Sequence, residues 1–308
     1  MIPVPRERNE GVAAAREGQR RLVEIFEEID GRSCGTHSGA RARGGGGTAR
    51  VITDGTVFER GGVNVSVVEG DDLPKEMRDS RGLPEGIPFF ATGISMVLHP
   101  RNPHVPAFHA NFRYFEAGDR EDWWFGGGAD LTPAYPVEAD VRYFHETLQE
   151  LCERHEVADH PRFKAWCDDY FTVRHRGEMR GVGGIFYDHL KPEGPDGWSA
   201  AAALMADGIR TLEAAYPPLV RKRLDSAWTE KERQWQLLRR GRYAEFNLVY
   251  DRGTRFGLDT GGDVEAILMS LPPLVRWETH ADPAPGTPEA ASLPFFQPRD
   301  WSPASQDR

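Results

Sequence analysis

Two runs of alternating polar and apolar residues, 94–99 and 108–115, constrain the fold of this chain more than any other feature. Successive side chains of a β-strand point to opposite faces of a sheet, so each run has one apolar face and one polar face. The polar faces carry Ser95 and His99 in the first run and His109, Asn111 and Arg113 in the second. The proline-rich segment between the runs favours extended or turn geometry. We therefore expect two strands that present these five side chains on a shared surface.

Such a polar surface has two interpretations. Antiparallel sheets often have one face in water, and the surface then has no special role. Here the polar positions hold His, Asn and Arg rather than Lys and Glu, and the sequence WWFGGG follows at 123–128. Aromatic side chains next to glycines, which permit close approach to the backbone, suit a flat and bulky ligand. We favour the ligand-binding interpretation.

Composition and charge define a broad class of protein. The chain has 308 residues, of which 39% are hydrophobic and 28% charged, which is typical of a soluble globular protein. The net charge of −10 argues against broad binding to nucleic acid or anionic membranes, so an acidic substrate must be met by local arginines. No apolar run approaches the ~20 residues of a membrane span, and the first residues contain no apolar signal core. Because Cys34, Cys152 and Cys167 form no CxxC pair, we expect a reducing, cytoplasmic location.

The pattern of helical and strand signals predicts a single α+β domain over residues 1–280, followed by a Pro-rich tail, 281–308, that lies on the surface or is disordered. A helix is expected over 7–29, and the Gly- and Arg-rich stretch 31–47 is expected to be a mobile loop. Periodicity predicts a long helix over 219–240, ended by Gly241, and a strand over 243–250.

Four blocks of sequence carry a specific resemblance. They are LHPRNPHVPAFHANFRYFE, WWFGGGADLTPAY, CDDYFTVRHRGEMRGVGGIFYD and EFNLVYDRGTRFGLDTGGDVEAILMSLPPLVRWE. In this order they closely resemble the oxygen-dependent coproporphyrinogen III oxidase family, over about residues 44–278. The resemblance implies a large, mostly antiparallel sheet flanked by helices on both sides. It also implies a substrate cleft between sheet and helices, and a homodimer formed through about 243–277.

The resemblance implies a reaction as well. That family oxidatively decarboxylates the propionates of rings A and B of coproporphyrinogen III to vinyl groups, giving protoporphyrinogen IX for haem biosynthesis. O2 is the oxidant, and CO2 and H2O2 are released. No flavin, haem or nicotinamide is implied, and the sequence has neither a GxGxxG nor a CxxCH motif.

Site residues follow by matching positions to the family's motifs. His109, Asp251 and Arg252 are the implied catalytic residues: a proton donor, an acid facing the pyrrole nitrogens and a propionate clamp. The implied substrate-binding positions are Ser95, Asn111, Phe112, Arg113, Gly261, Gly262 and Asp263. Asp263 departs from the basic residue usual there, so its side chain is a doubtful carboxylate ligand. From the residues alone, a charged turn with its own salt bridge is the favoured interpretation of Asp251 and Arg252.

The resemblance also marks four histidines as possible ligands of a divalent metal such as Mn. They are His99, His109, His145 and His175, whose spacing matches no HxH or HExxH signature. Hydrogen-bonding roles are an equal alternative. Two other functions stay open: a histidine-ligated non-haem metal oxygenase acting on a different aromatic acid, and a tetrapyrrole carrier that lacks the chemistry.

Overall fold

The fold is built on one large sheet. The computed structural model describes residues 6–40, 45–73, 75, 78–79, 82–118, 122–259, 264–279 and 282–301. Seven strands form the sheet in the order β1-β2-β3-β4-β5-β6-β9, with every neighbouring pair antiparallel. Their bounds are β1 (Gly35–Ala40), β2 (Gly45–Thr53), β3 (Phe58–Gly70), β4 (Phe89–Pro100), β5 (Ala107–Ala117), β6 (Asp122–Thr132) and β9 (Gly184–Leu190). A small hairpin of β7 (Thr172–Val173) and β8 (Glu178–Met179) precedes β9.

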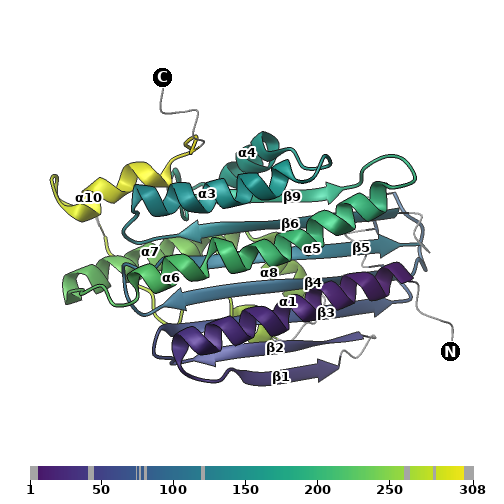
Figure 1. Ribbon diagram of the computed structural model, residues 1–308, viewed down its shortest axis with the longest axis horizontal. Coiled ribbons are helices and arrows are strands. Elements are labelled where there is room, and N and C mark those ends of the chain that lie inside the picture. The colour runs from purple at the N-terminus through teal and green to yellow at the C-terminus, as the bar shows by residue number, and fades with distance from the viewer. Residues whose placement is uncertain are drawn as a thin grey trace.

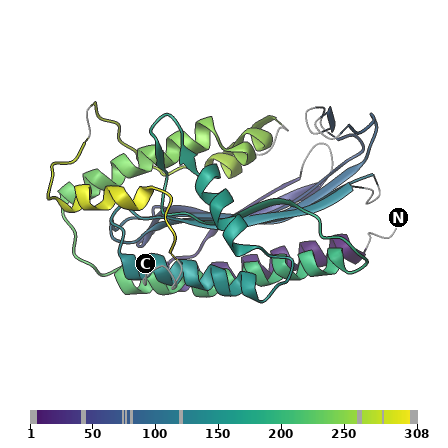
Figure 2. The same ribbon diagram turned by 90° about the horizontal axis from the view of Figure 1, so that it is seen from above.

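Helices cover both faces of this sheet, as the resemblance implies (Figure 1). One layer contains α1 (Arg6–Asp30), α3 (Glu138–Glu153), α5 (Gly197–Ala215) and α6 (Pro217–Arg223), and α4 (His160–Tyr170) lies beside β9. The other layer contains α7 (Glu230–Val249), α8 (Arg252–Asp259) and α9 (Val264–Leu268). Figure 2 shows the two helical layers on either side of the sheet. The C-terminal part adds α10 (Pro288–Ser292) and a 3₁₀ turn, η1 (Leu293–Phe296).

The apolar face of the central strands packs against the layer of α1 and α5. Ile94, Met96, Phe108 and Phe112 are all buried in this core. Phe112 lies so close to α5 that a Cβ at Gly208 would come within 2.4 Å of its ring. The alternation in the sequence therefore predicts correctly which face of β4 and β5 is buried, and the odd-numbered residues are left for the face under α7.

The prediction of a loop over 31–47 is wrong for residues 35–40 and 45–47, which lie in strands, while residues 31–34 are outside helix and strand as predicted. Residues 35–40 form β1 and residues 45–53 form β2. These two strands pair with each other, and β2 also pairs with β3, where Gly47 lies opposite Ser66. A Cβ at Gly47 would lie 2.8 Å from the carbonyl oxygen of Val65. Glycine here permits close approach of the neighbouring strand, so the lack of periodicity does not indicate a loop.

The predicted helix over 219–240 is divided between α6 and α7, with a break at 224–229, and the predicted strand over 243–250 is wrong, since these residues belong to α7 except Tyr250. Thr229 and Glu232 form a capping box that begins a new helix, α7, which continues through Gly241 to Val249. Gly241 does not end the helix. A Cβ there would lie 2.7 Å from the carbonyl oxygen of Arg276, so glycine is needed for the contact with that segment.

The C-terminal residues are ordered as far as the structure describes them. Phe296 and Trp301 belong to the hydrophobic core, and the carboxylate of Glu289 accepts a hydrogen bond from Tyr135 at 2.8 Å. The disordered alternative is therefore wrong for residues 282–301, which pack against the domain.

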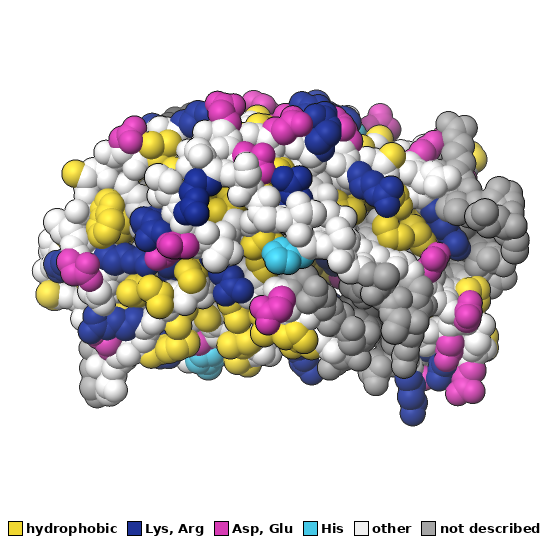
Figure 3. Space-filling model, turned by 90° about the horizontal axis from the view of Figure 1, so that it is seen from below, with side chains coloured by type: hydrophobic (Ala, Val, Ile, Leu, Met, Phe, Trp, Pro, Cys, Tyr) yellow, Lys and Arg dark blue, Asp and Glu magenta, His cyan; other side chains and the backbone are white. Residues whose placement is uncertain are grey.

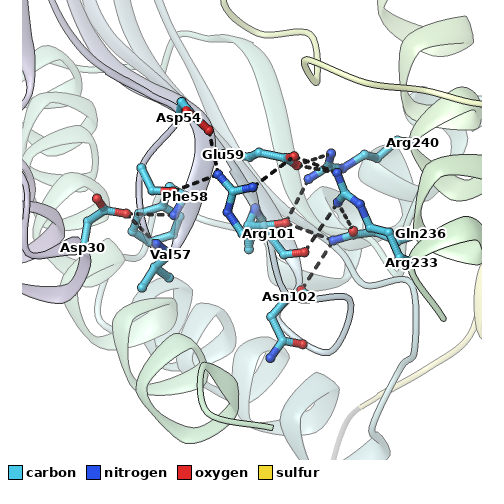
Figure 4. Close-up of polar contacts among 12 residues, drawn as sticks. Asp30, Asp54, Val57, Phe58, Glu59, Arg101, Asn102, Arg233, Gln236 and Arg240 are labelled. Atoms are coloured by element: carbon cyan, nitrogen blue, oxygen red, sulfur yellow. Dashed lines mark hydrogen bonds and ion pairs between the residues drawn. The ribbon is translucent and has the colours of Figure 1, made fainter. Parts of the chain in front are cut away.

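A buried group of charges fixes α7 to the end of the sheet (Figure 4). The carboxylate of Glu59 on β3 accepts hydrogen bonds from Arg233 at 2.7 and 2.8 Å and from Arg240 at 2.7 Å. Arg240 also donates to the carbonyl oxygen of Pro100 at 2.8 Å. Burial opposes ionisation of Glu59, but the two arginines outweigh burial and hold its pKa below the usual value. These contacts set the position of α7 over the polar face.

Candidate active site

The polar face of the sheet has a floor of glycines. In the strand register Gly93 lies opposite Arg113, Gly128 opposite Asn111 and Gly126 opposite Arg113. Ser95 lies opposite Asn111, so the two predicted strands do bring their polar side chains together. Because glycine has no side chain, this part of the sheet is flat and can be approached closely.

Arg113 is held at the edge of this floor by two partners. Its guanidinium donates to Oδ1 of Asn111 at 2.8 Å and lies 2.9 Å from Oδ1 of Asp188 on β9. A Cβ at Gly126 would come within 2.9 Å of both Arg113 Nε and Asp188 Oδ1, so glycine makes room for the pair. Asp188 also lies 3.8 Å from the guanidinium of Arg252. One carboxylate thus stands between two arginines, one from the sheet and one from α8.

His109 belongs to a chain of polar contacts that leads into the protein. Its Nδ1 lies 2.7 Å from Oδ1 of the buried Asp130, which in turn receives hydrogen bonds from Arg180 at 2.8 and 3.0 Å. Burial opposes ionisation of Asp130, but Arg180 and His109 outweigh burial and keep its pKa below the usual value. An ionised Asp130 accepts a hydrogen bond from Nδ1–H of His109, which leaves Nε2 as the ring nitrogen available for chemistry.

Aromatic rings enclose the guanidinium of Arg180. Its central carbon lies 4.2 Å from the ring centre of Phe171, 4.4 Å from that of Tyr243 and 4.9 Å from that of Phe246. Its NH1 also donates to Asn247 at 2.6 Å. These rings come from α7 and from the segment after α4, so the chain His109–Asp130–Arg180 is locked between the sheet and the helices.

Asp251 and Arg252 stand at the start of α8. Oδ2 of Asp251 accepts hydrogen bonds from the backbone N–H and the hydroxyl of Thr254, at 2.7 and 2.8 Å. Burial opposes ionisation of Asp251, but these two donors outweigh burial and hold its pKa below the usual value. The side chain of Arg252 is exposed and lies 5.0 Å from the ring centre of Tyr170. The local salt bridge between the two residues, favoured from the residues alone, is not the arrangement here.

The four histidines do not form a shared metal site. His145 lies on α3, beyond the opposite face of the sheet from His109, and its Nε2 donates to the carbonyl oxygen of Val182 at 3.1 Å. His175 contacts Tyr250 and Glu245, each at 2.7 Å. Nowhere in the described ranges do three His, Cys, Asp or Glu side chains gather as metal ligands. The arrangement does not fit a common divalent ion, and we derive no step through one.

His99 is buried in surroundings that disfavour a cation. Its Nε2 lies 2.9 Å from the carbonyl oxygen of Ser270, and its ring meets Tyr243 edge-on at 5.0 Å. Burial, with Arg240 nearby, lowers the pKa of His99 to about 3. Burial likewise lowers the pKa of His145 to about 3. Both side chains are therefore neutral hydrogen-bonding groups at physiological pH.

Four further predicted positions are not seen on the polar face: one lies on the opposite face, and three lie outside the described residues. The side chain of Phe112 is buried on the opposite face, against α5. Gly261, Gly262 and Asp263 lie outside the described residues. A surface pocket of about 890 Å³ exists elsewhere, between α3, α4 and residues 298–300, but it contains none of the polar-face residues. We place the site at the polar face because that is where the arginines, the His–Asp pair and the glycine floor coincide.

Sequence reasoning missed Asp130, Arg180, Asp188 and Tyr170. Asp130 lies opposite His109 in the pairing of β5 with β6, so a prediction of that strand register from the sequence could have found it. Arg180, Asp188 and Tyr170 come from segments whose position depends on the placement of β9 and α4. Their proximity to the site follows from the tertiary structure alone.

Comparison with known proteins identifies the class to which this fold and site belong. The family model described as Coproporphyrinogen III oxidase matches residues 12–301, nearly the whole chain. The chain belongs to this family, which confirms the resemblance found in the four sequence blocks.

Individual relatives carry a more specific name than the family model. Three proteins named oxygen-dependent coproporphyrinogen-III oxidase match most of the chain. The one from Parasynechococcus marenigrum (strain WH8102) is 49% identical over 300 residues, covering 90% of this chain and 82% of the relative. The one from Prochlorococcus marinus (strain MIT 9313) is 47% identical, covering 92% and 87%. The one from Synechococcus sp. (strain CC9605) is 48% identical, covering 92% and 84%.

Proposed function

We propose that this chain catalyses the aerobic oxidative decarboxylation of coproporphyrinogen III to protoporphyrinogen IX, converting the propionates of rings A and B to vinyl groups. For each propionate, a Cβ–H bond and the bond to the carboxyl carbon break, a C=C bond forms and CO2 leaves. Two electrons pass to O2, which takes up two protons to become H2O2. The Cβ–H bond supplies one proton, so the other must come from a donor.

The observation that carries this proposal is the flat polar face with a cation on either side. A macrocycle with four carboxylates needs a surface that it can approach closely and groups that bind carboxylates. The glycine floor meets the first need, and Arg113 and Arg252 meet the second, because guanidinium groups bind carboxylates with two parallel hydrogen bonds. Asp188 already occupies a carboxylate position between them. The spacing of the two arginines is therefore compatible with one propionate group.

His109 is the proton donor in this proposal. Asp130 accepts a hydrogen bond from Nδ1–H and orients the ring, so Nε2–H is the group that gives its proton to the reduced oxygen. Asp251 stays ionised and polarises a pyrrole N–H, which makes the ring more electron-rich for transfer of electrons to O2. Asp263 has no role assigned, because the basic residue usual at that position is replaced.

Turnover with and without O2 tests the function. Purified protein is incubated with coproporphyrinogen III, the porphyrinogens are then oxidised, and the porphyrins are separated by chromatography with fluorescence detection. We expect protoporphyrin in air and none without O2, with no added flavin, haem, nicotinamide or metal. Binding without turnover would support the carrier instead. Loss of all activity when a stoichiometric metal is removed would support the metal oxygenase.

We further propose a homodimer formed through residues 243–277. Among the described residues of this region, six large hydrophobic side chains are exposed: Leu248, Val249, Leu258, Val264, Leu274 and Trp277. Figure 3 shows hydrophobic side chains gathered on the side of the molecule that carries α7 to α9. Exposed apolar groups gathered in this way are typical of a subunit interface.

A cytoplasmic location is the remaining part of the proposal. Cys34, Cys152 and Cys167 are all free thiols, which suits a reducing compartment. Among the described helices, none is long and apolar enough to cross a membrane.

A further inference from the structure

Tyr170, the last residue of α4, contacts both residues of the Asp251–Arg252 pair. Its hydroxyl donates a hydrogen bond to Oδ1 of Asp251 at 3.0 Å and accepts one from the backbone N–H of Arg252 at 3.2 Å. The guanidinium of Arg252 lies over the Tyr170 ring at 5.0 Å from its centre. One side chain thus touches the carboxylate, the backbone and the cation at the start of α8.

The ring of Tyr170 is held firmly in place. It stacks on Phe186 of β9 with ring centres 4.3 Å apart and planes 7° from parallel. It also meets Phe171 and Phe246 edge-on, at 4.9 and 5.5 Å. Burial, followed by the charge of Asp251, raises the pKa of Tyr170 to about 12. The hydroxyl therefore stays protonated, and it remains a donor to Asp251 throughout the neutral range.

The two carboxylate oxygens of Asp251 accept hydrogen bonds from residues of different helices. Thr254 holds Oδ2 from within α8, as a helix cap does. Tyr170 holds Oδ1 from the end of α4. Thr254 alone orients the carboxylate relative to its own helix. Tyr170 orients it relative to the sheet, because its ring is stacked on a strand of that sheet.

We propose that Tyr170 is a positioning residue, which sets the orientation and the basicity of the Asp251 carboxylate relative to the polar face. This inference rests on the role of Asp251 in the proposed function. Loss of the Tyr170 hydroxyl removes a hydrogen bond to a charged acceptor, so we expect Tyr170→Phe to lower kcat about tenfold with little change in KM. The same loss removes a stabiliser of the ionised form, so the acidic limb of the kcat–pH profile should move to higher pH.

Tyr216 offers a matched control. It stacks on Phe108 with ring centres 4.5 Å apart, and its hydroxyl donates to the carbonyl oxygen of Pro106 at 2.9 Å, within the core. Tyr216→Phe removes a buried hydroxyl of the same kind far from Asp251. It should lower thermal stability while kcat and its pH profile stay those of the wild type.

The decisive experiment combines Tyr170→Phe with Asp251→Asn. If Tyr170 acts through Asp251, the double variant should be no slower than Asp251→Asn alone. If the wild type is active, two results overturn the inference. One is a double variant whose loss of kcat is the product of the two single losses, and the other is a Tyr170→Phe variant with wild-type kcat and pH profile. A wild type without turnover overturns the proposed function instead. As a second variant, 4-aminophenylalanine at position 170 keeps a donor and should restore most of kcat. If both variants fold and the 4-aminophenylalanine variant has no higher kcat than Tyr170→Phe, the inference fails. If Tyr170→Phe does not fold and the 4-aminophenylalanine variant folds but is inactive, the inference also fails.

Discussion

Nδ1 of His109 lies 2.7 Å from Oδ1 of Asp130, and the two residues face each other directly in the ladder between β5 and β6. The strand pairing therefore fixes the histidine and its carboxylate partner together. The orientation of the imidazole follows from its contact with Asp130, which Arg180 holds in turn. A group that must donate a proton along one direction benefits from this rigidity.

The first prediction concerns this pair. His109→Ala should lower kcat by ~10²-fold, the low end for general acid–base catalysis, and leave the fold intact. His155 and Asp207 form a similar pair away from the polar face, at 3.0 Å, so His155→Ala is the control and should keep full activity. Steady-state kinetics with circular dichroism measure both effects. Unchanged activity in His109→Ala would reduce His109 to a structural residue.

A second prediction separates Asp251 from Arg252. Asp251→Asn keeps a good helix cap for Thr254 but removes the charge, so kcat should fall with little loss of affinity. Arg252→Ala should mainly weaken binding, because a carboxylate clamp holds the ground state and the transition state alike. Binding of the unreactive oxidised porphyrin, measured beside turnover, distinguishes the two. Equal and small effects of both variants on both quantities would contradict the assignment.

The third prediction concerns the anchor of α7. Glu59→Gln leaves Arg233 and Arg240 buried without their anion, which should cost about 3–5 kcal/mol in the free energy of unfolding. Asp54 makes an exposed ion pair with Arg101 in the same region, at 2.8 Å. Asp54→Asn should therefore cost less than about 1 kcal/mol. Urea denaturation measures both values, and similar small losses in the two variants would contradict this account of the anchor.

Stability should depend on pH through Glu245. Burial opposes ionisation of this carboxyl, but hydrogen bonds from Arg176, Trp277 and His175 outweigh burial and lower its pKa to about 2. A pKa lowered by folding means that the stabilisation is fully present above the usual value of 4.5 and is lost as the pH falls towards 2. The difference in unfolding free energy between wild type and Glu245→Gln should thus shrink between pH 4.5 and pH 2. A difference independent of pH would show that the charge of Glu245 contributes nothing.

The proposed dimer makes a fifth prediction. Trp277→Asp places a charge among the exposed hydrophobic side chains of 243–277 and should shift the protein from dimer to monomer in light scattering. Trp228 is exposed as well but precedes α7, outside that region. Trp228→Asp should leave the dimer intact. A wild type that is monomeric at micromolar concentration would contradict the proposal.

The alternation of residues predicted the central strands correctly because side-chain period and burial agree there. Ser95 meets Asn111 as expected, and Phe112 lies on the buried face as its parity requires. The end of helix α7 was predicted wrongly because of a tertiary contact. Gly241 reads as a helix end, yet it serves a close contact with the carbonyl of Arg276, a residue far along the chain.

The site was predictable only in part for a similar reason. Arg113 and His109 lie on strands whose register the sequence predicts. Asp188 and Tyr170 reach the same site because β9 pairs with β6 and α4 packs beside β9. No local pattern encodes that order of strands.

The stoichiometry of gas and peroxide tests the central claim most directly. Purified protein with coproporphyrinogen III in air should consume one O2 and release one CO2 and one H2O2 for each vinyl group formed. The same ratio should hold when flavin, haem, nicotinamide and added metal are all absent from the assay. Vinyl formation without O2 uptake, or O2 uptake without matching CO2 and H2O2, would contradict an oxidative decarboxylation in which O2 itself accepts the two electrons.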